Sequence, residues 1–190
     1  MLTPAQIQAL AAIVGEKNTL SEREDLICYG YDATQFEAPP DVVVFPTTTE
    51  QVSQVMAYAY EQEIPVFPRG AGSGLSGGSA PAGGGIALVL NRMNRILEIN
   101  TDDLYARAEP GVVVADLIAA AGKKGLLFPP DPSSMKTCTL GGSVAENAGG
   151  LRGLKYGVTR DYVLALTVVA PDGRIFRLRD PLSVLTNGAP

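Results

Sequence analysis

The chain carries the sequence RGAGSGLSGG at residues 69–78, in which five of the ten residues are glycine. The apolar run IPVFP (64–68) precedes it and GIALVLNRM (85–93) follows it, and both are typical of buried strands. Glycine accepts positive φ and lets another group approach the backbone closely. We therefore expect a strand–loop–strand passage whose backbone N–H groups form a concave site for an anion.

Two common phosphate-binding motifs do not fit this passage. Gly72, Gly74 and Gly77 satisfy G-x-G-x-x-G, but a Rossmann site also requires a helix to begin at the motif. The continuation SAPAGGG (79–85) places a proline and three glycines before a strand, so no helix is expected. A Walker A loop requires a Lys-Ser or Lys-Thr pair after the glycines, and none follows. An anion-binding loop and a flexible surface loop remain as alternatives.

The rest of the chain alternates short strands with helices. Thr3 and Pro4 predict a helix that ends near Gly15, and Thr48 with Gln51 predicts a capping box at the next helix. Further strands are expected at 41–46, 96–100 and 104–110, a helix at 112–125, a short helix after the glycines of TLGG (139–142), and a hairpin around PDG (171–173). The pattern predicts an α+β fold with mixed strands.

Composition excludes several classes of function. The 190 residues carry a net charge of −5 and are 46% hydrophobic, which argues against a nucleic-acid or anionic-membrane partner and allows a real core. No apolar run approaches the roughly 20 residues of a transmembrane helix, and the N-terminus has no basic region typical of a signal peptide. The chain has no histidine, which removes histidine-based catalysis and metal binding. We expect Cys28 and Cys138 to be small buried residues in a reducing cytoplasm.

A second passage combines prolines, hydroxyls and glycines. PPDPSS (129–134) fixes the backbone direction and CTLGGSVAENAGG (138–150) leads into a helix. Its glycines allow the close approach of an anion or of a ring rich in carbonyl groups at the start of that helix. Two such passages in one small domain suggest a long ligand held at both ends, and a dinucleotide fits that description.

Four motifs then occur in a specific order: PRGAGSGLSGG, PPDPSSMKTCTLGGSVAENAGG, LKYGVTRDYVLALTVV and PDG. Over residues 41–178 they resemble the FAD-binding domain of the vanillyl-alcohol-oxidase (p-cresol-methylhydroxylase, PCMH) type. The resemblance is strongest to the flavin subunit of glycolate oxidase and to the D-lactate and D-2-hydroxyglutarate dehydrogenases. It implies a two-lobed α+β domain: a helix and irregular lead-in at 1–40, a first lobe at 41–90, and a second lobe at 91–190 that is incomplete at its C-terminus.

The resemblance also implies the residues of the cofactor site. The FAD pyrophosphate would lie on the backbone of Arg69, Gly70, Ala71, Gly72, Ser73 and Gly74. The isoalloxazine and ribityl side would be lined by Pro130, Asp131, Ser133, Ser134, Gly141, Gly142, Ala145, Asn147 and Gly150. A turn beside the flavin would comprise Gly157, Val158 and Thr159, and Val168 would lie near the adenine. No catalytic residue and no metal ligand is assigned.

Some family members attach FAD to a histidine in the glycine loop, where this chain has Ser73 and Gly74. Cys138 lies near the second passage, but the related subgroup carries this cysteine without a tether. We therefore expect FAD to bind non-covalently.

Other polar and aromatic residues have open or structural interpretations. Arg152 and Lys155 could attract an anionic substrate or form a surface basic pair, and both alternatives stay open. Solvent exposure is expected for the carboxylates of Glu98, Asp102 and Asp103, and packing roles for Tyr29 and Tyr31.

The resemblance implies the FAD-binding part of an oxidoreductase that oxidises a small 2-hydroxy acid such as glycolate or D-lactate. Family members continue with a GSEGTLG-like segment and a substrate domain, whereas this chain ends RDPLSVLTNGAP, so we expect no substrate domain and no activity of the chain alone. A C-terminal substrate domain or an iron–sulfur subunit is the partner to consider, in the cytoplasm or at the membrane through partner subunits. A non-catalytic FAD-binding module and the same fold with a different substrate are the alternatives.

Overall fold

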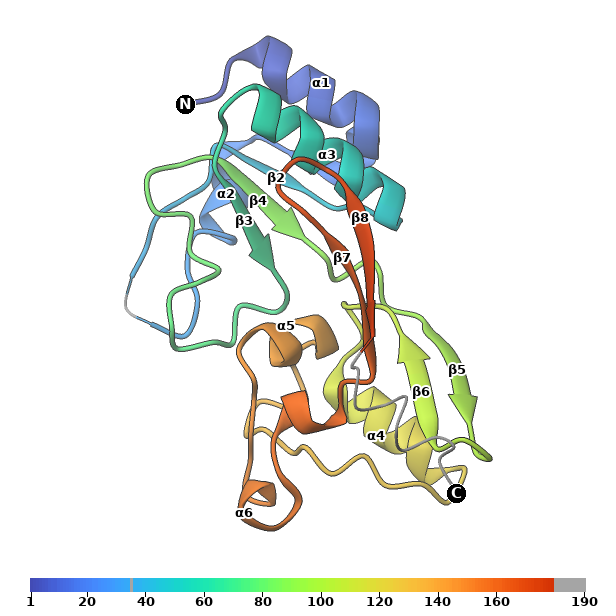
Figure 1. Ribbon diagram of the computed structural model, residues 1–190. Coiled ribbons are helices and arrows are strands. Elements are labelled where there is room, and N and C mark those ends of the chain that lie inside the picture. Colours follow the sequence, from blue (N-terminus) through green and yellow to red (C-terminus); the bar gives the residue numbers. More distant parts are fainter. Residues whose placement is uncertain (35, 180–190) are drawn as a thin grey trace.

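A computed structural model describes residues 1–34 and 36–179 of the chain. Its helices are α1 (Pro4–Val14), α2 (Arg23–Ile27), α3 (Thr49–Glu61), α4 (Val114–Gly122), α5 (Leu140–Ala145) and α6 (Gly153–Tyr156), with 3-10 turns η1 (Glu16–Asn18) and η2 (Thr159–Tyr162). Its strands are β1 (Thr19–Leu20), β2 (Val42–Val44), β3 (Val66–Arg69), β4 (Ile86–Val89), β5 (Ile96–Asn100), β6 (Tyr105–Ala108), β7 (Ala165–Val169) and β8 (Ile175–Arg179). Figure 1 shows two lobes, with the β7–β8 hairpin running between them.

The first lobe is built on a four-stranded sheet in the order β1-β2-β4-β3. The strands β2, β4 and β3 are parallel, and β1 is antiparallel to β2. Every residue of β2 and β4 is buried, as expected for strands covered on both faces. On one face, Leu10 of α1 and Val55 of α3 pack against Val42 and Ile86. On the other face, Phe45 and its neighbours pack against partly buried residues that include Tyr29.

Residues 1–40 belong physically to this lobe, because α1 packs on the sheet and β1 pairs with β2. The predicted cap of α1 is confirmed: Gln6 N–H donates to Thr3 Oγ1, and Thr3 N–H donates to Gln6 Oε1. At α3, Gln51 N–H donates to Thr48 Oγ1 as predicted. The return bond of that capping box is shifted, because Gln51 Oε1 accepts from Thr47 N–H at 2.8 Å.

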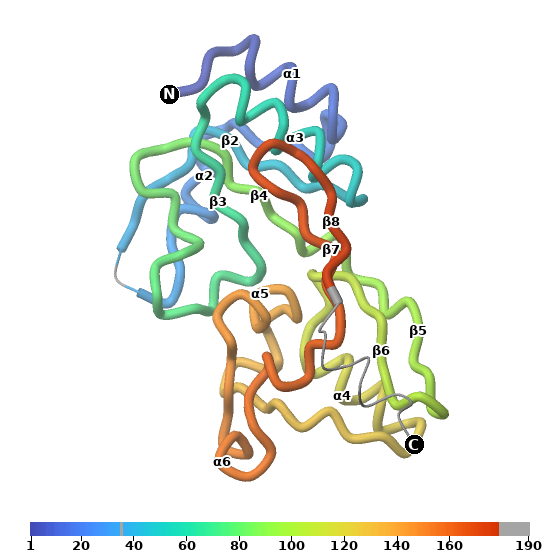
Figure 2. The backbone as a smooth tube through the Cα atoms, in the orientation of Figure 1, coloured from blue at the N-terminus to red at the C-terminus, as the bar shows by residue number. Residues whose placement is uncertain are grey.

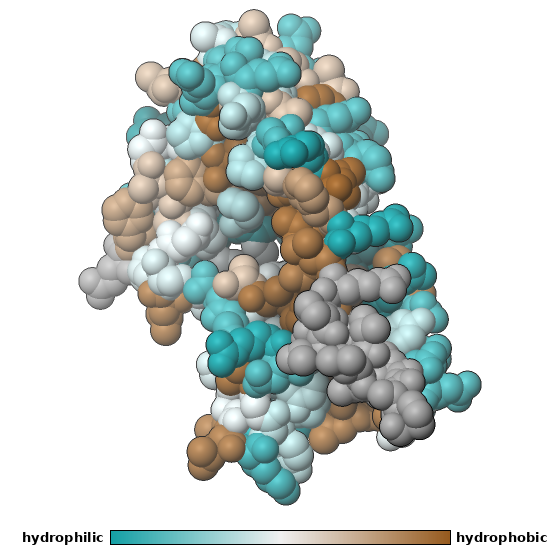
Figure 3. All heavy atoms as spheres, in the orientation of Figure 1, coloured by the Kyte–Doolittle hydropathy of each residue, from teal (hydrophilic) through white to brown (hydrophobic). Residues whose placement is uncertain are grey.

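The second lobe contains α4, α5, α6 and the antiparallel pair β5–β6. The hairpin β7–β8 reaches from this lobe to α3 of the first lobe, where Ser53 Oγ donates to Gly173 O at 2.6 Å. Gly173 has to be glycine there, since an added Cβ would lie 2.7 Å from Ser53 O and its φ is +83°. Apolar side chains remain partly exposed on the hairpin and gather down the middle of the face in Figure 3.

The predicted α+β fold with mixed strands, the strand–loop–strand passage and the PDG hairpin are therefore confirmed. The prediction that both cysteines are buried is wrong for Cys28, because it follows the five-residue surface helix α2 and is exposed. Cys138 is buried. Among the described residues, none of the helices has the length and apolar content needed to cross a bilayer. The final residues of the predicted second lobe, 180–190, lie outside the described residues.

Candidate cofactor site

The first glycine passage is a loop that leaves β3 at Arg69 and returns to the sheet at β4. Figure 2 shows this loop, in green, descending from the sheet toward α5. Gly72 and Gly77 have φ of +68° and +78°, which L side chains rarely adopt. The backbone N–H groups from Ala71 to Ser79 have no acceptor among the described residues. A continuous run of unpaired donors is suited to an anion with several oxygens.

The Arg69 side chain forms the floor of the loop. Arg69 is only 6% exposed. A Cβ at Gly72 would collide with the Arg69 guanidinium, so the absent side chain makes room for this cation directly beneath the loop. Arg69 Nη1 donates to Ser79 O at 3.4 Å, and the guanidinium lies 5.9 Å from the centre of the Tyr29 ring. Burial lowers the pKa of Arg69 below its ordinary value, and nearby Asp32 opposes that change.

The other side of the loop is open. A Cβ at Gly74 would meet only Ser76 Oγ, at 4.0 Å, and one at Gly77 would meet no atom within 4 Å. Gly74 is not among the residues with positive φ, so its lack of a side chain provides space and does not relieve strain. A ligand can therefore approach the backbone from this side.

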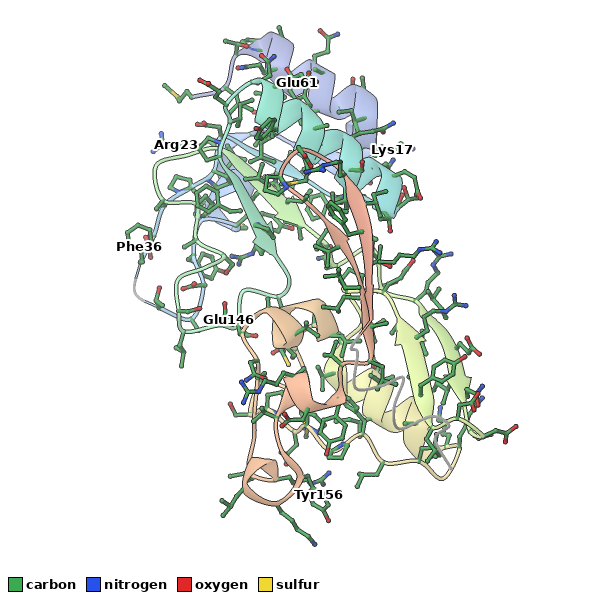
Figure 4. All side chains as sticks on the ribbon, viewed as in Figure 1. Lys17, Arg23, Phe36, Glu61, Glu146 and Tyr156 are labelled. Carbon is green, nitrogen blue, oxygen red and sulfur yellow. The ribbon has the colours of Figure 1, made fainter. Side chains whose placement is uncertain are left out.

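The two glycine-rich passages meet in space. A Cβ at Gly70 would collide with Oγ1 of Thr139, which is buried and caps α5. Ser76 Oγ donates to Glu146 Oε2 at 2.7 Å, and Glu146 lies where the lobes meet in Figure 4. A hollow of about 280 Å³ opens beside this junction, just below the volume of roughly 300 Å³ at which small-molecule sites begin. It is lined by Ala71, Asn91, Asn94, Gly111, Val113, Asp116, Thr137 and Thr139.

The first three N–H groups of α5 already have acceptors within the protein. Leu140 N–H donates to Val112 O at 2.7 Å, and Gly141 N–H donates to Pro110 O at 2.8 Å. Gly142 N–H donates to Thr139 Oγ1. Protein carbonyls and the capping hydroxyl already accept from these N–H groups, so an anion would have to displace them, and the expected anion or ring at this helix start stays a prediction. Gly141 is needed for packing, since a Cβ there would lie 2.6 Å from Pro110 Cβ.

Asp131 shapes the turn that follows α5. Its carboxylate accepts from Arg152 N–H at 3.1 Å and pairs with Arg152 Nε at 3.5 Å. An added Cβ at Gly150 would collide with Asp131. Lys155 instead extends over the Tyr156 ring, 4.9 Å from its centre. Arg152 thus has a structural partner in Asp131, and the two basic side chains make separate contacts.

Several other predicted site residues make hydrogen bonds that stabilise the segment after α5, residues 147–161. Asn147, with φ of +50°, accepts from Arg160 N–H at 3.0 Å, and Thr159 Oγ1 donates to Ala148 O at 2.6 Å. Val158 N–H donates to Asp161 Oδ2 at 2.7 Å, next to Gly157 with φ of +86°.

The remaining predicted residues differ in exposure and in free polar groups. Pro130 is buried, Ala145 is exposed, and Val168 is half-buried on β7. The hydroxyls of Ser73, Ser133 and Ser134 make no hydrogen bond to any described residue, so they stay available as donors.

The acidic and tyrosine residues that were given no cofactor role make local contacts. Glu98 accepts from Tyr105 O–H at 2.8 Å and pairs with Arg107 at 3.6 Å. Asp103 accepts from the Asn100 side chain. Within the described residues, no three His, Cys, Asp or Glu side chains are grouped so as to hold a metal ion. Tyr29 packs edge-on against Phe45, with ring centres 5.5 Å apart.

A protein-family model described as an FAD binding domain matches residues 40–179. The chain belongs to the FAD binding domain family. It is 46% identical over 178 residues to glycolate oxidase subunit GlcD of Bacillus subtilis, covering 93% of this chain and 38% of that protein. It is 41% identical over 184 residues to a D-lactate dehydrogenase of Anaerostipes hadrus, covering 96% of this chain and 37% of that protein. The chain thus spans less than two-fifths of the length of these relatives.

Solved structures share the fold of this FAD binding domain. A p-cresol methylhydroxylase with substrate bound superposes with a TM-score of 0.80 at 26% identity, covering 93% of this chain and 36% of that one. An alkyldihydroxyacetonephosphate synthase superposes with a TM-score of 0.84 at 23% identity, covering 95% of this chain and 35% of that one. The expected PCMH-type architecture is therefore confirmed.

The geometry of this FAD binding domain fits the cofactor of its family. The diphosphate of FAD carries acceptor oxygens, and the run of N–H groups from Ala71 to Ser79 supplies donors with no protein partner among the described residues. The space that a side chain would fill at Gly74 or Gly77 contains no protein atom closer than 4.0 Å to the added Cβ. The second passage adds the free hydroxyls of Ser133 and Ser134.

Sequence reasoning missed three interactions near this site. No signal in the sequence linked Glu146 of the second passage to Ser76, although this carboxylate joins the two passages. For Tyr29 the expectation is packing, in a segment that lies close to FAD in the family's usual layout, and the structure adds that its ring faces Arg69. Asp32 was not singled out, although DAT (32–34) has the spacing of an Asp that bonds the backbone two residues on, and that signal could have found it.

Proposed function

We propose that this chain is the FAD-binding part of an oxidoreductase that acts on a small 2-hydroxy acid, with FAD held non-covalently. The observation that carries the proposal is the run of N–H groups from Ala71 to Ser79, which find no acceptor in residues 1–34 and 36–179 and lie against the second passage through Gly70 and Thr139. Relatives named as glycolate oxidase and D-lactate dehydrogenase, at 46% and 41% identity, support the substrate class.

The residues of this chain bind FAD and orient it. The N–H groups of Ala71 to Ser79 donate to the diphosphate, and the cation of Arg69 beneath Gly72 adds a favourable charge. Ser133 and Ser134 donate to the ring and ribityl side, where Pro130 fixes the backbone direction. When bound, FAD supplies the chemistry that accepts a hydride equivalent.

Non-covalent binding is supported by the side chains near the site. The chain contains no histidine, and Ser73 and Gly74 occupy the position at which histidine attachment occurs in some family members. Cys138 is buried, with Ser143 Oγ 3.7 Å from its sulfur, so this thiol lies inside the packing. The two unpaired cysteines also favour a cytoplasmic location.

The base that removes the hydroxyl proton is proposed to lie outside residues 1–179. The two carboxylates of the cofactor passages are already engaged, Asp131 by Arg152 and Glu146 by Ser76. A general base has to be within hydrogen-bond reach of the proton it takes. We assign that role to a substrate-binding domain. The relatives are long enough to contain such a domain beyond the part that this chain matches.

The test is a titration of the purified chain with FAD and with FMN, followed by quenching of flavin fluorescence. We expect FAD to bind at least tenfold more tightly, because FMN lacks the second phosphate and the adenosine. ADP should displace FAD in competition. Acid precipitation should then release all flavin into the supernatant. Equal or tighter binding of FMN contradicts the dinucleotide proposal, and flavin that stays with the pellet contradicts non-covalent binding.

A further inference from the structure

Asp32 is a buried carboxylate whose bonding is only half complete. The residue is 6% exposed. Its Oδ1 accepts from Thr34 N–H at 2.8 Å and from Thr34 O–H at 2.6 Å. Its Oδ2 is buried and has no hydrogen-bond partner among the described residues. A buried carboxylate oxygen without a partner is costly, so its presence calls for a compensating charge nearby.

Arg69 is that charge. Its guanidinium is buried under Gly72 and makes one long hydrogen bond, to Ser79 O at 3.4 Å. The bond from the Thr34 hydroxyl lowers the pKa of Asp32, and the positive charge of Arg69 adds to that effect. Asp32 in turn is the leading influence that counters the effect of burial on Arg69. The two side chains make no direct ion pair, so their charges act on each other through the interior, where burial weakens screening by water.

The segment that carries Asp32 is also tied to the glycine loop through the backbone. Ala33 N–H donates to Gly74 O at 3.2 Å. Tyr29, at the start of the same segment, lies beneath the Arg69 guanidinium. The family match begins at residue 40, so these contacts come from outside the region that defines the family.

We infer that Asp32 is a positioning residue for diphosphate binding, which holds Arg69 beneath Gly72 and so keeps the loop's N–H groups in their concave arrangement. This inference rests on the proposed function. Removing the charge of Asp32 leaves a buried guanidinium without its counter-ion, and a buried unpaired charge is strongly unfavourable. Arg69 then moves toward water through the loop above it, and the diphosphate site is lost.

The experiment is a double-mutant cycle with Asp32→Asn, Arg69→Gln and the double variant. Asparagine keeps the oxygen that accepts from Thr34 and removes only the charge. We expect Asp32→Asn to weaken FAD and ADP at least tenfold and AMP less than threefold. In the Arg69→Gln background, the same change should alter FAD affinity less than twofold. Asp102→Asn, on an exposed turn, is the matched control and should leave all three affinities unchanged.

Each alternative outcome decides the matter. Unchanged FAD affinity in Asp32→Asn, or an equal loss in both backgrounds, overturns the inference while the proposed function stands. A wild-type chain that binds neither FAD nor ADP overturns the proposed function and this inference with it. If Asp32→Asn does not fold, thermal unfolding of the double variant decides: restored folding supports the charge pair, and continued unfolding refutes it.

Discussion

The hydroxyl of Ser76 donates to the carboxylate of Glu146 at 2.7 Å and joins two loops that are 70 residues apart in sequence. Together with the contact between Gly70 and Thr139, this bond holds the two glycine-rich passages against each other. Contacts within the protein therefore fix the two passages against one another. A preformed arrangement of this kind lowers the entropic cost of binding a long ligand.

Replacing Ser76 with alanine removes this connection and should speed the release of FAD about two- to tenfold, since a hydrogen bond contributes roughly 0.5–1.5 kcal/mol. The measurement is the return of flavin fluorescence after dilution of the loaded protein. Ser21→Ala, at an exposed serine, is the matched control. An unchanged release rate would show that the Ser76–Glu146 bond does not retain the cofactor.

Valine at Gly72 and valine at Gly74 should have different effects. Gly72 has φ of +68° and an added side chain meets Arg69, so Gly72→Val should lower both thermal stability and FAD affinity. Gly74 has neither constraint, so Gly74→Val should keep the melting temperature and still weaken FAD at least tenfold by filling the open side of the loop. Circular dichroism melting and flavin titration measure the two effects. Gly122→Val, in an open position of α4, controls for the substitution itself.

If both variants lose stability equally, both glycines are structural. Space for a ligand is then not the reason that residue 74 is a glycine.

The Arg95–Glu109 pair should make stability depend on pH. Glu109 is 9% exposed, and its carboxylate accepts from Arg95 Nη2 at 2.6 Å and from Arg95 N–H at 2.8 Å. The Arg95 side chain lowers the pKa of Glu109 below its usual 4.5. The stabilisation is therefore present above that usual value and is lost as the pH falls through the lowered pKa.

We expect Glu109→Gln to melt about 2–4 °C lower than wild type at pH 7, a range typical of a small loss in a protein of this size. The difference should shrink once the pH falls below about 4. Glu98→Gln, at a more exposed carboxylate, is the matched control and should change the melting temperature less. A deficit that stays constant down to pH 3 would mean that charge is not its cause.

The 190-residue chain loaded with FAD should not oxidise glycolate, D-lactate or D-2-hydroxyglutarate at a useful rate. A positioned general base contributes roughly 10²- to 10⁴-fold, and the carboxylates at the cofactor passages are held by Arg152 and Ser76. A dye-linked assay at saturating substrate, together with the absorbance of the bound flavin, measures the activity. Substrate-dependent bleaching of the flavin would disprove this expectation and direct attention to Lys155 and Tyr156.

The sequence predicted local structure well where one residue type determines it. Thr3 and Pro4 specify the first cap, and the all-valine β2 specifies a buried strand. The glycine run at 69–78 predicted a loop between strands because glycine adopts the positive φ found at Gly72 and Gly77 far more readily than other residues. The motif order then gave the family, which the match at residues 40–179 confirms.

Long-range partners were beyond sequence reasoning. The spacing of Asp131 and Gly150 does not reveal that the carboxylate occupies the space of a missing side chain. Gly141 suggested close approach of a ligand, yet its neighbour is Pro110, on a loop that the one-dimensional pattern does not connect to it. Such contacts depend on how the loops of the second lobe pack together, and that packing is decided by many weak contacts at once.

The tip of the β7–β8 hairpin, where Ser53 Oγ bonds Gly173 O, closes a sequence separation of 120 residues. The second lobe thus gains part of its support from a helix that is synthesised long before the hairpin exists. Closing such a long loop costs conformational entropy before the contact can contribute stability. This cost favours slow folding. Together with Val169 of β7, which packs on the core of the first lobe, the tie couples the two lobes, and we expect calorimetry to show a single heat-absorption peak.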